Sequence, residues 1–418
     1  MIFRVAYIFL QLAILLFELL IYKLRLISTE NYGKLLARRI EKFGGIYLKI
    51  GQLLSVRPDI ISFAIADHLY PLLQNLTPVP FTYVKKIIIQ NLGEDYKGQI
   101  QDIDSKPLGT GSIAQVHKIV LADGRPAVLK LLKPGIAKYV QIDLRMFKFF
   151  MSVGSYIPGL KKLPTKELAT EINSLIIDQL NLETEAENLL QFKKNFIENS
   201  DIIIPELNKH LINKEFFVMQ YIELPPKINF EEWNKEKRTL VAEKALKMLY
   251  QMMFKDGFTH CDMHPGNFFI TEEGQFILLD FGMVTRMNAE FRNDFIRFFF
   301  YMSTNNGKGC AEIIEKTALH KSKRFNREKL QTEVCLFIND FSSLPAEEFS
   351  VLAFTKRLIE VERKCGIKGA TAFINNILAI TFFESHLKRL DPGIDFQEEA
   401  AQYILKNVPA FVDIVNEL

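Results

Sequence analysis

The sequence predicts an α+β fold, with one mixed core and helical extensions at both ends of the chain. Three observations support this prediction. Residues 107–133 combine glycines and β-branched residues around a turn at 122–124, which is typical of strand–turn–strand structure. Residues 216–222 form a short apolar run before two prolines, and residues 268–279 contain two apolar runs around Glu273-Gly274. Long amphipathic segments fill most of the remaining chain.

The helical elements are expected from periodic apolar positions between polar breaks. Residues 23–75 are predicted as helices with breaks near 28–32 and 57–59, and 77–81 as a loop. The other predicted helices cover residues 81–92, 165–197 and 232–255, and most of the chain after Arg286, apart from loops near 305–309 and 342–345.

Composition excludes several classes of protein. The chain has 418 residues, of which 48% are apolar and 24% charged, so it is an ordinary globular chain with room for two or three domains. Its net charge of +3 provides no general nucleic-acid footprint. The four cysteines contain no CxxC pair, so we expect buried free thiols in a reducing compartment and no disulfide framework.

Residues 5–22 form one apolar segment in which only Gln11 and Glu18 are polar. Eighteen helical residues measure about 27 Å, close to the roughly 30 Å of a bilayer's hydrocarbon core. The two polar residues are seven apart and so share one helix face. The segment is therefore compatible with a helix that spans a membrane, lies on it or packs on the protein, whereas a removed signal peptide is not expected.

The first candidate site element is a glycine-rich turn. Small residues here would let backbone N–H groups approach a phosphate closely, although the pattern alone is also typical of any tight turn. Its candidate nucleotide-binding residues are Gly109, Thr110, Gly111 and Ser112.

The second element is Lys130, at the end of the apolar run Ala127–Lys130. A buried ammonium is costly unless it is paired, and a carboxylate or a phosphate would pair it. Glu185, on the acidic helix, is the candidate partner. The alternative is a lysine that extends from the strand end into solvent.

The third and fourth elements follow in the order HCDMHPGN (260–267) and DFG (280–282). Asp262 and Asn267 are five residues apart, as in kinase catalytic loops, where the carboxylate orients a hydroxyl or water and the amide oxygen binds magnesium. A predicted hairpin would bring Asp280 back beside Asn267 to complete the metal site. His260 and His264 have the spacing of metal ligands, but Pro265-Gly266 predicts a loop and there is no evident third ligand.

A further motif lies upstream, at Lys49-Ile50-Gly51-Gln52. Lys49 and Gln52 share one helix face, and the residues alone indicate only an amphipathic helix that contains a glycine.

Four motifs together resemble the UbiB/AarF (ADCK-type) family of atypical protein-kinase-like proteins. They are KxGQ at 49–52, AVLKLLKPG at 127–135, HCDMHPGN at 260–267 and DFG at 280–282. The resemblance covers about residues 30–400 and includes LKRLDPGIDF at 387–396. It implies a protein-kinase-like bilobal fold, with a small mixed N-lobe, a mostly helical C-lobe and a KxGQ extension that covers the nucleotide site. The implied domains are an apolar helix at 1–28, the KxGQ extension at 29–100, the N-lobe with inserted helices at 101–224 and the C-lobe at 225–418.

The resemblance also implies roles for individual residues. Lys130 would contact ATP phosphates and pair with Glu185, Asp262 would be the catalytic aspartate, and Asn267 and Asp280 would bind Mg²⁺. Lys49 and Gln52 would act at the same nucleotide site. The hinge beside adenine would be Val218–Tyr221, with Met219, Gln220 and Tyr221 binding the nucleotide.

The function implied by the resemblance is a membrane-associated, Mg-ATP-dependent kinase or ATPase that supports ubiquinone or related isoprenoid-lipid biosynthesis. Its partners would be a membrane lipid or quinone precursor and other quinone-biosynthesis proteins, without nucleic acid. It would act on the reducing side of a bacterial, mitochondrial or plastid inner membrane. The alternatives are a nucleotide-gated membrane scaffold, a protein kinase acting in trans and an aminoglycoside-type kinase, although the last lacks KxGQ and the chain shows no APE-type motif after DFG.

The chain departs from the family pattern at two places. The family's phosphate loop is usually alanine-rich, whereas this one contains Gly109 and Gly111, which predicts a more flexible loop that permits phosphoryl transfer. The family's acidic ExD motif aligns with Gln179-Leu180-Asn181, so two amides stand in place of two carboxylates. This exchange predicts an altered regulatory contact with Lys49, unless Asp178 or Glu183 substitutes.

Overall fold

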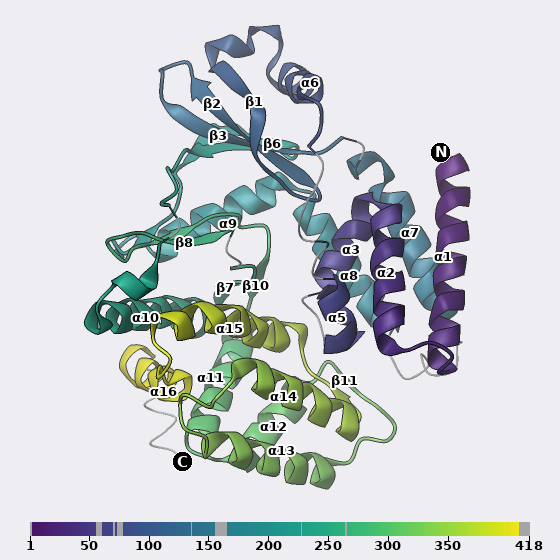
Figure 1. Cartoon of the computed structure of the whole chain (residues 1–418), viewed down its shortest axis with the longest axis vertical. Coiled ribbons are helices and arrows are strands. Elements are labelled where there is room, and N and C mark those ends of the chain that lie inside the picture. Colours follow the sequence, from purple (N-terminus) through teal and green to yellow (C-terminus); the bar gives the residue numbers. More distant parts are fainter. Residues whose placement is uncertain are drawn as a thin grey trace. The chain divides into compact units, whose positions relative to one another are not determined.

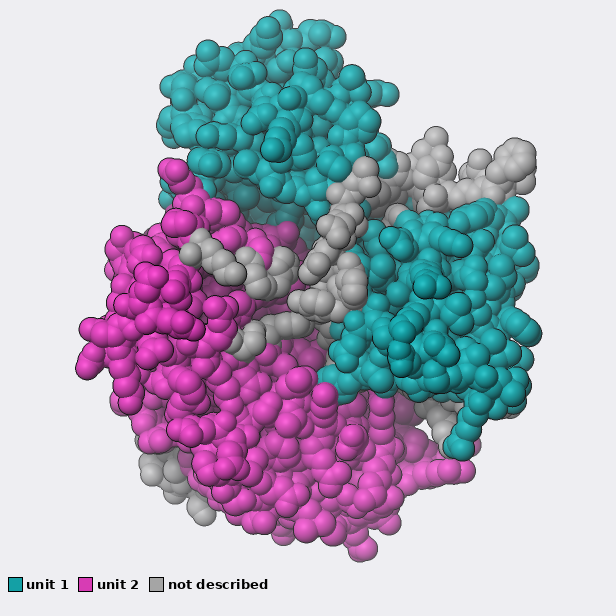
Figure 2. All heavy atoms as spheres, in the orientation of Figure 1, with its two compact units in different colours: residues 1–190, 205–222 teal, residues 191–204, 223–418 magenta. Residues whose placement is uncertain are grey.

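The computed structural model describes residues 2–55, 61–69, 72, 78–134, 136–154, 165–226, 228–263 and 266–408 (Figure 1). The chain forms two compact units, coloured separately in Figure 2. Unit 1 contains residues 1–190 and 205–222, and unit 2 contains residues 191–204 and 223–418. Mixed strands and helices in both units confirm the predicted α+β class.

Unit 1 contains a five-stranded sheet in the order β1-β2-β3-β6-β5, in which all neighbours are antiparallel. Helix α6 (Phe81–Leu92) packs its buried apolar side chains against this sheet, as in the shared core of Val84, Ile88 and Leu129. The strands are β1 (Ile100–Thr110), β2 (Ala114–Leu121), β3 (Pro126–Leu132), β5 (Leu207–Ile212) and β6 (Phe216–Gln220).

The sequence prediction identified the inner strands better than the outer ones. β5 and most of β1 lie outside the predicted strands, and these are the two edge strands of the sheet. Most β1 residues are exposed, and they include Asp102, Asp104 and Lys106. An edge strand with charged side chains lacks the apolar pattern on which strand prediction depends.

The helices of unit 1 form a second group. α1 contacts α2 and α7, and α3 contacts α2, α5, α7 and α8. Ser28 caps α2 by accepting the Asn31 N–H at 3.2 Å, so the predicted break at 28–32 ends earlier than expected. The group comprises α1 (Ile2–Lys23), α2 (Thr29–Phe43), α3 (Gly45–Ser55), α5 (Phe63–Leu69), α7 (Ile136–Gly154) and α8 (Thr165–Gln179).

The predicted helix at 165–197 is two helices. α8 ends at Gln179, and α9 (Leu182–Asn195) begins after Leu180-Asn181. Asn181 accepts the Glu183 N–H at 3.2 Å, which is the hydrogen bond of an N-cap residue. The predicted break at 57–59 lies outside the described residues.

Unit 2 is mainly helical. Its first long helix within residues 223–418 is α10 (Lys235–Tyr250), which continues into a π-helical turn, Gln251–Asp256, and a short strand, β7 (Phe258–His260). The hairpin of β8 (Phe268–Ile270) and β9 (Phe276–Leu278) turns at Gly274, whose φ of +79° favours glycine, and this confirms the predicted hairpin. The remaining elements are β4 (Ile202–Ile203), β10 (Val284–Arg286), α11 (Ala289–Ser303), α12 (Gly307–Thr317), β11 (His320–Lys321), α13 (Arg327–Ser342), α14 (Val351–Cys365), β12 (Ile367–Lys368), α15 (Thr371–Leu390) and α16 (Phe396–Asn407).

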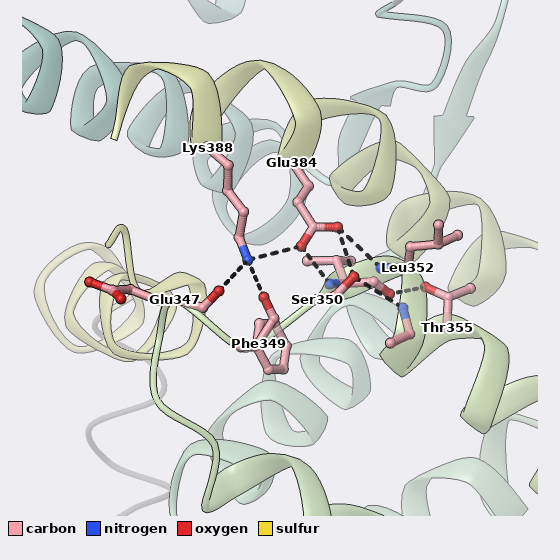
Figure 3. A network of polar contacts seen from close by, with 9 residues as sticks. Glu347, Phe349, Ser350, Leu352, Thr355, Glu384 and Lys388 are labelled. Carbon is pink, nitrogen blue, oxygen red and sulfur yellow. Dashed lines mark hydrogen bonds and ion pairs between the residues drawn. The ribbon is translucent and has the colours of Figure 1, made fainter. Parts of the chain in front are cut away.

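A buried carboxylate joins two of these helices (Figure 3). Glu384 of α15 accepts the N–H groups of Val351 at 2.8 Å and Leu352 at 3.2 Å, in the first turn of α14. Lys388 lies 3.6 Å from Glu384 and donates to the Phe349 carbonyl. A carboxylate at a helix N-terminus satisfies N–H groups that have no partner within the helix. This contact holds α14 against α15 and stabilises the helical end of unit 2.

We expect Asp256 to make stability depend on pH. Burial raises the pKa of this carboxyl to about 6, against the opposing effects of Gln251, Lys255 and Arg292. The native state therefore retains a proton between about pH 4 and 6 that the unfolded chain has lost, so the free energy of unfolding falls as pH rises through this window. Urea unfolding of Asp256→Asn should show a flatter pH profile there and a gain in stability relative to wild type above it. Parallel profiles would contradict this assignment.

Candidate active site

Lys130 and Glu185 form a buried ion pair in unit 1. The Lys130 Nζ lies 2.5 Å from Glu185 Oε1, and each residue is 6% exposed. Lys130 lies on β3 opposite Val116 of β2 and Phe217 of β6, so its backbone is fixed on both sides. The predicted pairing is present in the structure, whereas contact with ATP phosphates stays a prediction.

Helix α9 is positioned to supply this carboxylate. Its buried face contains Leu182, Ala186 and Leu189, and the Leu182 N–H donates to the Lys214 carbonyl at 3.2 Å. The capping bond from Asn181 sets where the helix begins, and Glu185 follows one turn later. The break between α8 and α9 therefore determines the position of Glu185.

The two amides at the ExD position have different surroundings. Asn181 is the N-cap of α9, a position that aspartate would fill equally well. Gln179 is 7% exposed, and no hydrogen bond to its Oε1 is found in the described part of the chain. The amide at 181 thus has a structural role, and the effect of both amides on regulation stays a prediction.

We expect Asn181→Ala to lower the free energy of unfolding by about 1 kcal/mol, because the first turn of α9 loses its cap. Asn181→Asp is the matched control and should unfold at the same denaturant concentration as wild type or higher, since aspartate also caps and its charge favours a helix N-terminus. Urea titration followed by circular dichroism measures both. Equal losses in the two variants would show that the cap is not the relevant contact.

The glycine-rich turn joins β1 and β2. Gly109 pairs with Val116 in the ladder, and the Gly111 N–H donates to the Ala114 carbonyl at 2.8 Å. That amide therefore closes the turn. A Cβ placed on Gly109 would meet nothing within 4 Å, so the backbone here does not require glycine. The prediction of a more flexible phosphate loop is not tested by this geometry.

Two buried side chains of β2, Gln115 and His117, make hydrogen bonds that the sequence did not predict. Gln115 accepts the Val79 N–H at 2.8 Å, and its Nε2 lies 2.7 Å from the His117 ring. His117 Nδ1 donates to the Asp104 carbonyl at 2.7 Å. The contact ties residues 78–80, within the predicted KxGQ extension, to β2. Polar residues at successive inward positions of a strand are the pattern that could have revealed it.

The predicted hinge residues lie at the end of β6. Met219 is buried, and the Gln220 N–H donates to the Glu206 carbonyl at 2.7 Å. The Lys118 ammonium lies 4.3 Å from the centre of the Tyr221 ring. The chain passes from unit 1 to unit 2 directly after Ile222, and adenine binding at this segment stays a prediction.

The KxGQ segment lies on α3 within unit 1. Gln52 is buried and donates from Nε2 to the Leu72 carbonyl at 2.9 Å. A Cβ on Gly51 would lie 2.6 Å from Ile40 Cγ2 and 3.0 Å from Leu72 Cδ1, so glycine permits close packing here. Lys49 is half-buried on the same helix. Gln52 thus has a structural partner inside the extension, and action of Lys49 and Gln52 on a nucleotide stays a prediction.

We expect Gly51→Ala to lower the free energy of unfolding of unit 1 by about 1–3 kcal/mol, because the new methyl group overpacks the contact between α3 and α2. Gly109→Ala introduces the same methyl group into open space and serves as the control. Thermal unfolding of both variants provides the comparison. Two equally stable variants would contradict the close packing at Gly51.

In unit 2, the β8–β9 hairpin brings together residues that are distant in sequence. The Leu279 N–H donates to the Asn267 carbonyl at 2.8 Å, directly before Asp280. Asn267 Nδ2 donates to the Asp262 carbonyl at 3.0 Å. The Cys261 N–H donates to the Met283 carbonyl at 3.0 Å. The catalytic-loop segment, Asn267 and the DFG segment are therefore held together by these hydrogen bonds, as the predicted hairpin requires.

His260 positions this group of residues. It is completely buried, its Nε2 donates to the Leu279 carbonyl at 3.2 Å, and its Nδ1 accepts the Asp262 N–H at 3.2 Å. Burial lowers the pKa of His260, although nearby Asp262 and Asp280 oppose this effect. A neutral imidazole satisfies both contacts, one as donor and one as acceptor. Since both ring nitrogens are engaged, the structure does not favour His260 as a metal ligand. His264 and Pro265 lie outside the described residues.

The DFG segment has a constrained backbone. Asp280 has a φ of +55°, in the left-handed region that aspartate tolerates better than most residues, and its Oδ1 accepts the Gly282 N–H at 3.1 Å. Phe281 is buried, with its ring 5.2 Å from that of Phe192 and 5.7 Å from that of His260. These contacts fix the carboxylate at the end of the hairpin.

The residues present fit a magnesium ion bound together with phosphates. The amide nitrogen of Asn267 holds the Asp262 carbonyl, so its oxygen is the atom suited to a cation, and Asp280 supplies a carboxylate. Magnesium usually takes one or two protein oxygens and completes its shell with phosphates and water. The described residues contain no cluster of three or more His, Cys, Asp or Glu that could hold a metal by itself.

Each unit thus carries part of the predicted site: Lys130, Glu185, the glycine turn and the hinge in unit 1, and Asp262, Asn267 and Asp280 in unit 2. A strand lysine paired with a helix glutamate, and a catalytic loop joined to DFG, define a kinase-like protein. Residues 71–314 match a family model described as "ABC1 atypical kinase-like domain". Because the match covers more than half of the chain, the chain belongs to this family.

Several curated relatives carry the name "Probable protein kinase UbiB". The chain is 31% identical over 284 residues to the one from Erwinia tasmaniensis, with 65% of this chain and 52% of the relative covered. It is 32% identical over 266 residues to the one from Aliivibrio fischeri, with 62% and 49% covered. The chain therefore spans about half the length of the curated relatives it matches.

A solved structure shows the same fold. It is that of Rv3197 from Mycobacterium tuberculosis in complex with erythromycin, and its TM-score against this chain is 0.58. The two share 19% identity over 80% of this chain and 84% of the other. The kinase-like bilobal fold predicted from the sequence is confirmed by this likeness together with the family match.

Proposed function

We propose that the chain is a Mg-ATP-dependent atypical kinase or ATPase that acts at a membrane in support of ubiquinone or related isoprenoid-lipid biosynthesis. The observation that carries the nucleotide part is the buried pair between Lys130 and Glu185, 2.5 Å apart. Two buried charges are costly to desolvate, and replacement by apolar residues is often neutral or stabilising. A pair of this kind is therefore best explained by a need to present a fixed ammonium to a phosphate.

The side chains suggest a division of roles. Lys130, oriented by Glu185, binds nucleotide phosphates. Asp262, whose backbone is held by His260 and Asn267, orients the attacking water or hydroxyl by accepting its proton. Asn267 and Asp280 bind the magnesium ion, which neutralises charge on the phosphates when it is present.

The membrane and quinone parts of the proposal have separate support. They follow from the KxGQ and HxDxHPGN motifs, which resemble the UbiB/AarF family, and from similarity to relatives named UbiB. One helix in the described part of the chain, Val5–Lys23, is long and apolar enough to cross a membrane by length and composition. All four cysteines are free thiols, and three are buried, in keeping with a reducing compartment.

The first test is magnesium-dependent release of phosphate from ATP by the purified protein. We expect Asp262→Asn to lower turnover about 100-fold or more, because the variant cannot accept the proton. Asp280→Asn should abolish magnesium-dependent turnover, since the amide keeps the shape of the turn but loses the charge. Asp123→Asn, at an exposed turn of unit 1, is the control and should match wild type.

The same assay separates the alternatives. Turnover that rises with anionic vesicles and a phenolic quinone-precursor mimic supports a membrane-acting enzyme. ATP binding without turnover in any condition overturns the enzyme in favour of a nucleotide-gated scaffold, and would make Gln179→Glu and Asn181→Asp the first variants to restore activity. Phosphate transfer to an added protein would instead support a protein kinase acting in trans.

A further inference from the structure

Helix α1 has an apolar face whose large side chains are mostly exposed. Phe9 is 51% exposed, Leu10 57% and Phe17 62%, and the helix is followed by exposed Leu24 and Leu26. Large exposed apolar patches on soluble proteins usually mark interaction sites. We call this surface the outer face of α1, defined by the exposed residues Ala6, Phe9, Leu10, Ala13 and Phe17.

The opposite face of α1 is packed on the protein. Both polar residues of the apolar segment, Gln11 and Glu18, contact Arg39 of α2. The Tyr7 hydroxyl donates to the Lys42 carbonyl at 3.1 Å, and the rings of Tyr22 and Tyr32 stack 4.5 Å apart. Because early residues of α1 meet late residues of α2, the two helices form an antiparallel pair along their length. Figure 1 shows α1 at the outer edge of this group of helices.

This packing is incompatible with a membrane-spanning α1. Lys34, Arg38 and Lys42 are exposed on α2, alongside α1. If α1 crossed the hydrocarbon core while packed on α2, these charges would enter it as well, and charged side chains are strongly disfavoured there. If α1 left α2, Glu18 and Arg39 would each lose a charged partner and Glu18 would enter hydrocarbon.

The charge of α1, α2 and α7 favours an anionic membrane as the partner of the outer face. Residues 1–43 and 136–154 contain ten basic and four acidic residues, a net charge of +6, whereas the whole chain carries +3. On α7, exposed Phe149 stacks edge-on with Phe150, which in turn contacts Phe9, and the neighbouring Arg145 and Lys148 are exposed. An apolar surface flanked by basic side chains matches the interface of an anionic membrane.

We propose that the outer face of α1 lies in the plane of an anionic membrane, with its apolar side chains inserted at the headgroup level and the basic residues of α2 and α7 beside the lipid phosphates. The inference rests on the membrane association in the proposed function, and it specifies the surface, the lipid charge and the orientation. Unit 1 is thereby bound to one leaflet and does not cross the bilayer.

Vesicle flotation of the full chain tests the surface. Wild type should float with phosphatidylcholine vesicles that contain phosphatidylglycerol, and less with phosphatidylcholine alone or at high salt. The double variant Leu10→Glu/Phe17→Glu should lower the partition coefficient about ten-fold or more. Leu336→Glu/Leu405→Glu, at similarly exposed leucines of unit 2, is the matched control and should float like wild type. The variant Arg38→Glu/Lys42→Glu should lose the preference for the anionic lipid.

Other occupants of the surface give different results. Equal flotation of the outer-face variant and the control would overturn the proposal. So would a wild type that does not float but forms a dimer that Leu10→Glu/Phe17→Glu converts to monomers, because the outer face would then bind a second copy of the chain. All four substituted residues of the outer-face variant and its control are substantially exposed, so circular dichroism should show unchanged folding.

A depth measurement tests the orientation. In a background with Trp233, the single tryptophan, changed to Phe, a tryptophan is placed at Ala6, Ala13 or Leu20. These positions are seven residues apart on one helix face, so a helix in the membrane plane holds all three at one shallow depth. Lipids brominated near the headgroup should then quench them equally. A spanning helix would place position 13 about 10 Å deeper than the other two, and preferential quenching there by lipids brominated deep in the chain would overturn the proposal.

Failure of this inference is distinguishable from failure of the proposed function. Flotation requires no nucleotide, and phosphate release can be measured without vesicles. Since the outer face contains none of the proposed catalytic residues, Leu10→Glu/Phe17→Glu should retain the basal ATP turnover of wild type while losing any stimulation by anionic vesicles. A variant that does not float yet keeps full stimulation by vesicles would contradict the proposal.

Discussion

The buried contact between Lys130 and Glu185 constrains most of unit 1. An ammonium at the centre of an apolar sheet needs a carboxylate nearby. That carboxylate belongs to Glu185, which lies on a different element, α9. To supply it, α9 must begin at a set position, which depends on the break after Gln179 and the cap by Asn181. The sheet must in turn hold Lys130 in register with β2 and β6. One charge requirement thus links the sheet to the helices that follow it.

In unit 2, hydrogen bonds to the backbone hold the candidate residues in place. These residues lie on short strands and turns, where side chains alone would define positions poorly. The β8–β9 hairpin and neutral His260 supply the missing order, because each bonds the catalytic-loop segment to the DFG segment. The left-handed backbone of Asp280 is held within this arrangement. Such rigidity suits catalysis by positioned charges, in which the groups need little reorganisation during the reaction.

In helix α1, two polar residues determine which face of an apolar segment packs on the protein. By length and composition, the helix is suited to crossing a membrane, lying on it or packing on the protein. Arg39 is the basis for our proposal that α1 does not span, because it binds both polar residues of the segment and holds α1 against α2 and its exposed charges. In the proposed arrangement, one face of α1 packs on the protein and the opposite face is available to lipid.

The sequence by itself determined the residue types of the candidate site, the α+β class, the inner strands and the hairpin, because these depend on residue type and on patterns within a few residues. It did not determine the edge strands β1 and β5, whose exposed charged side chains carry no apolar pattern, or the break that separates α8 from α9. Only the tertiary structure decided that Gly51 permits close helix packing, that His260 is held between two backbone groups and that Arg39 binds both polar residues of α1. Each of these depends on partners outside the local sequence pattern, at positions that only the packed fold brings together.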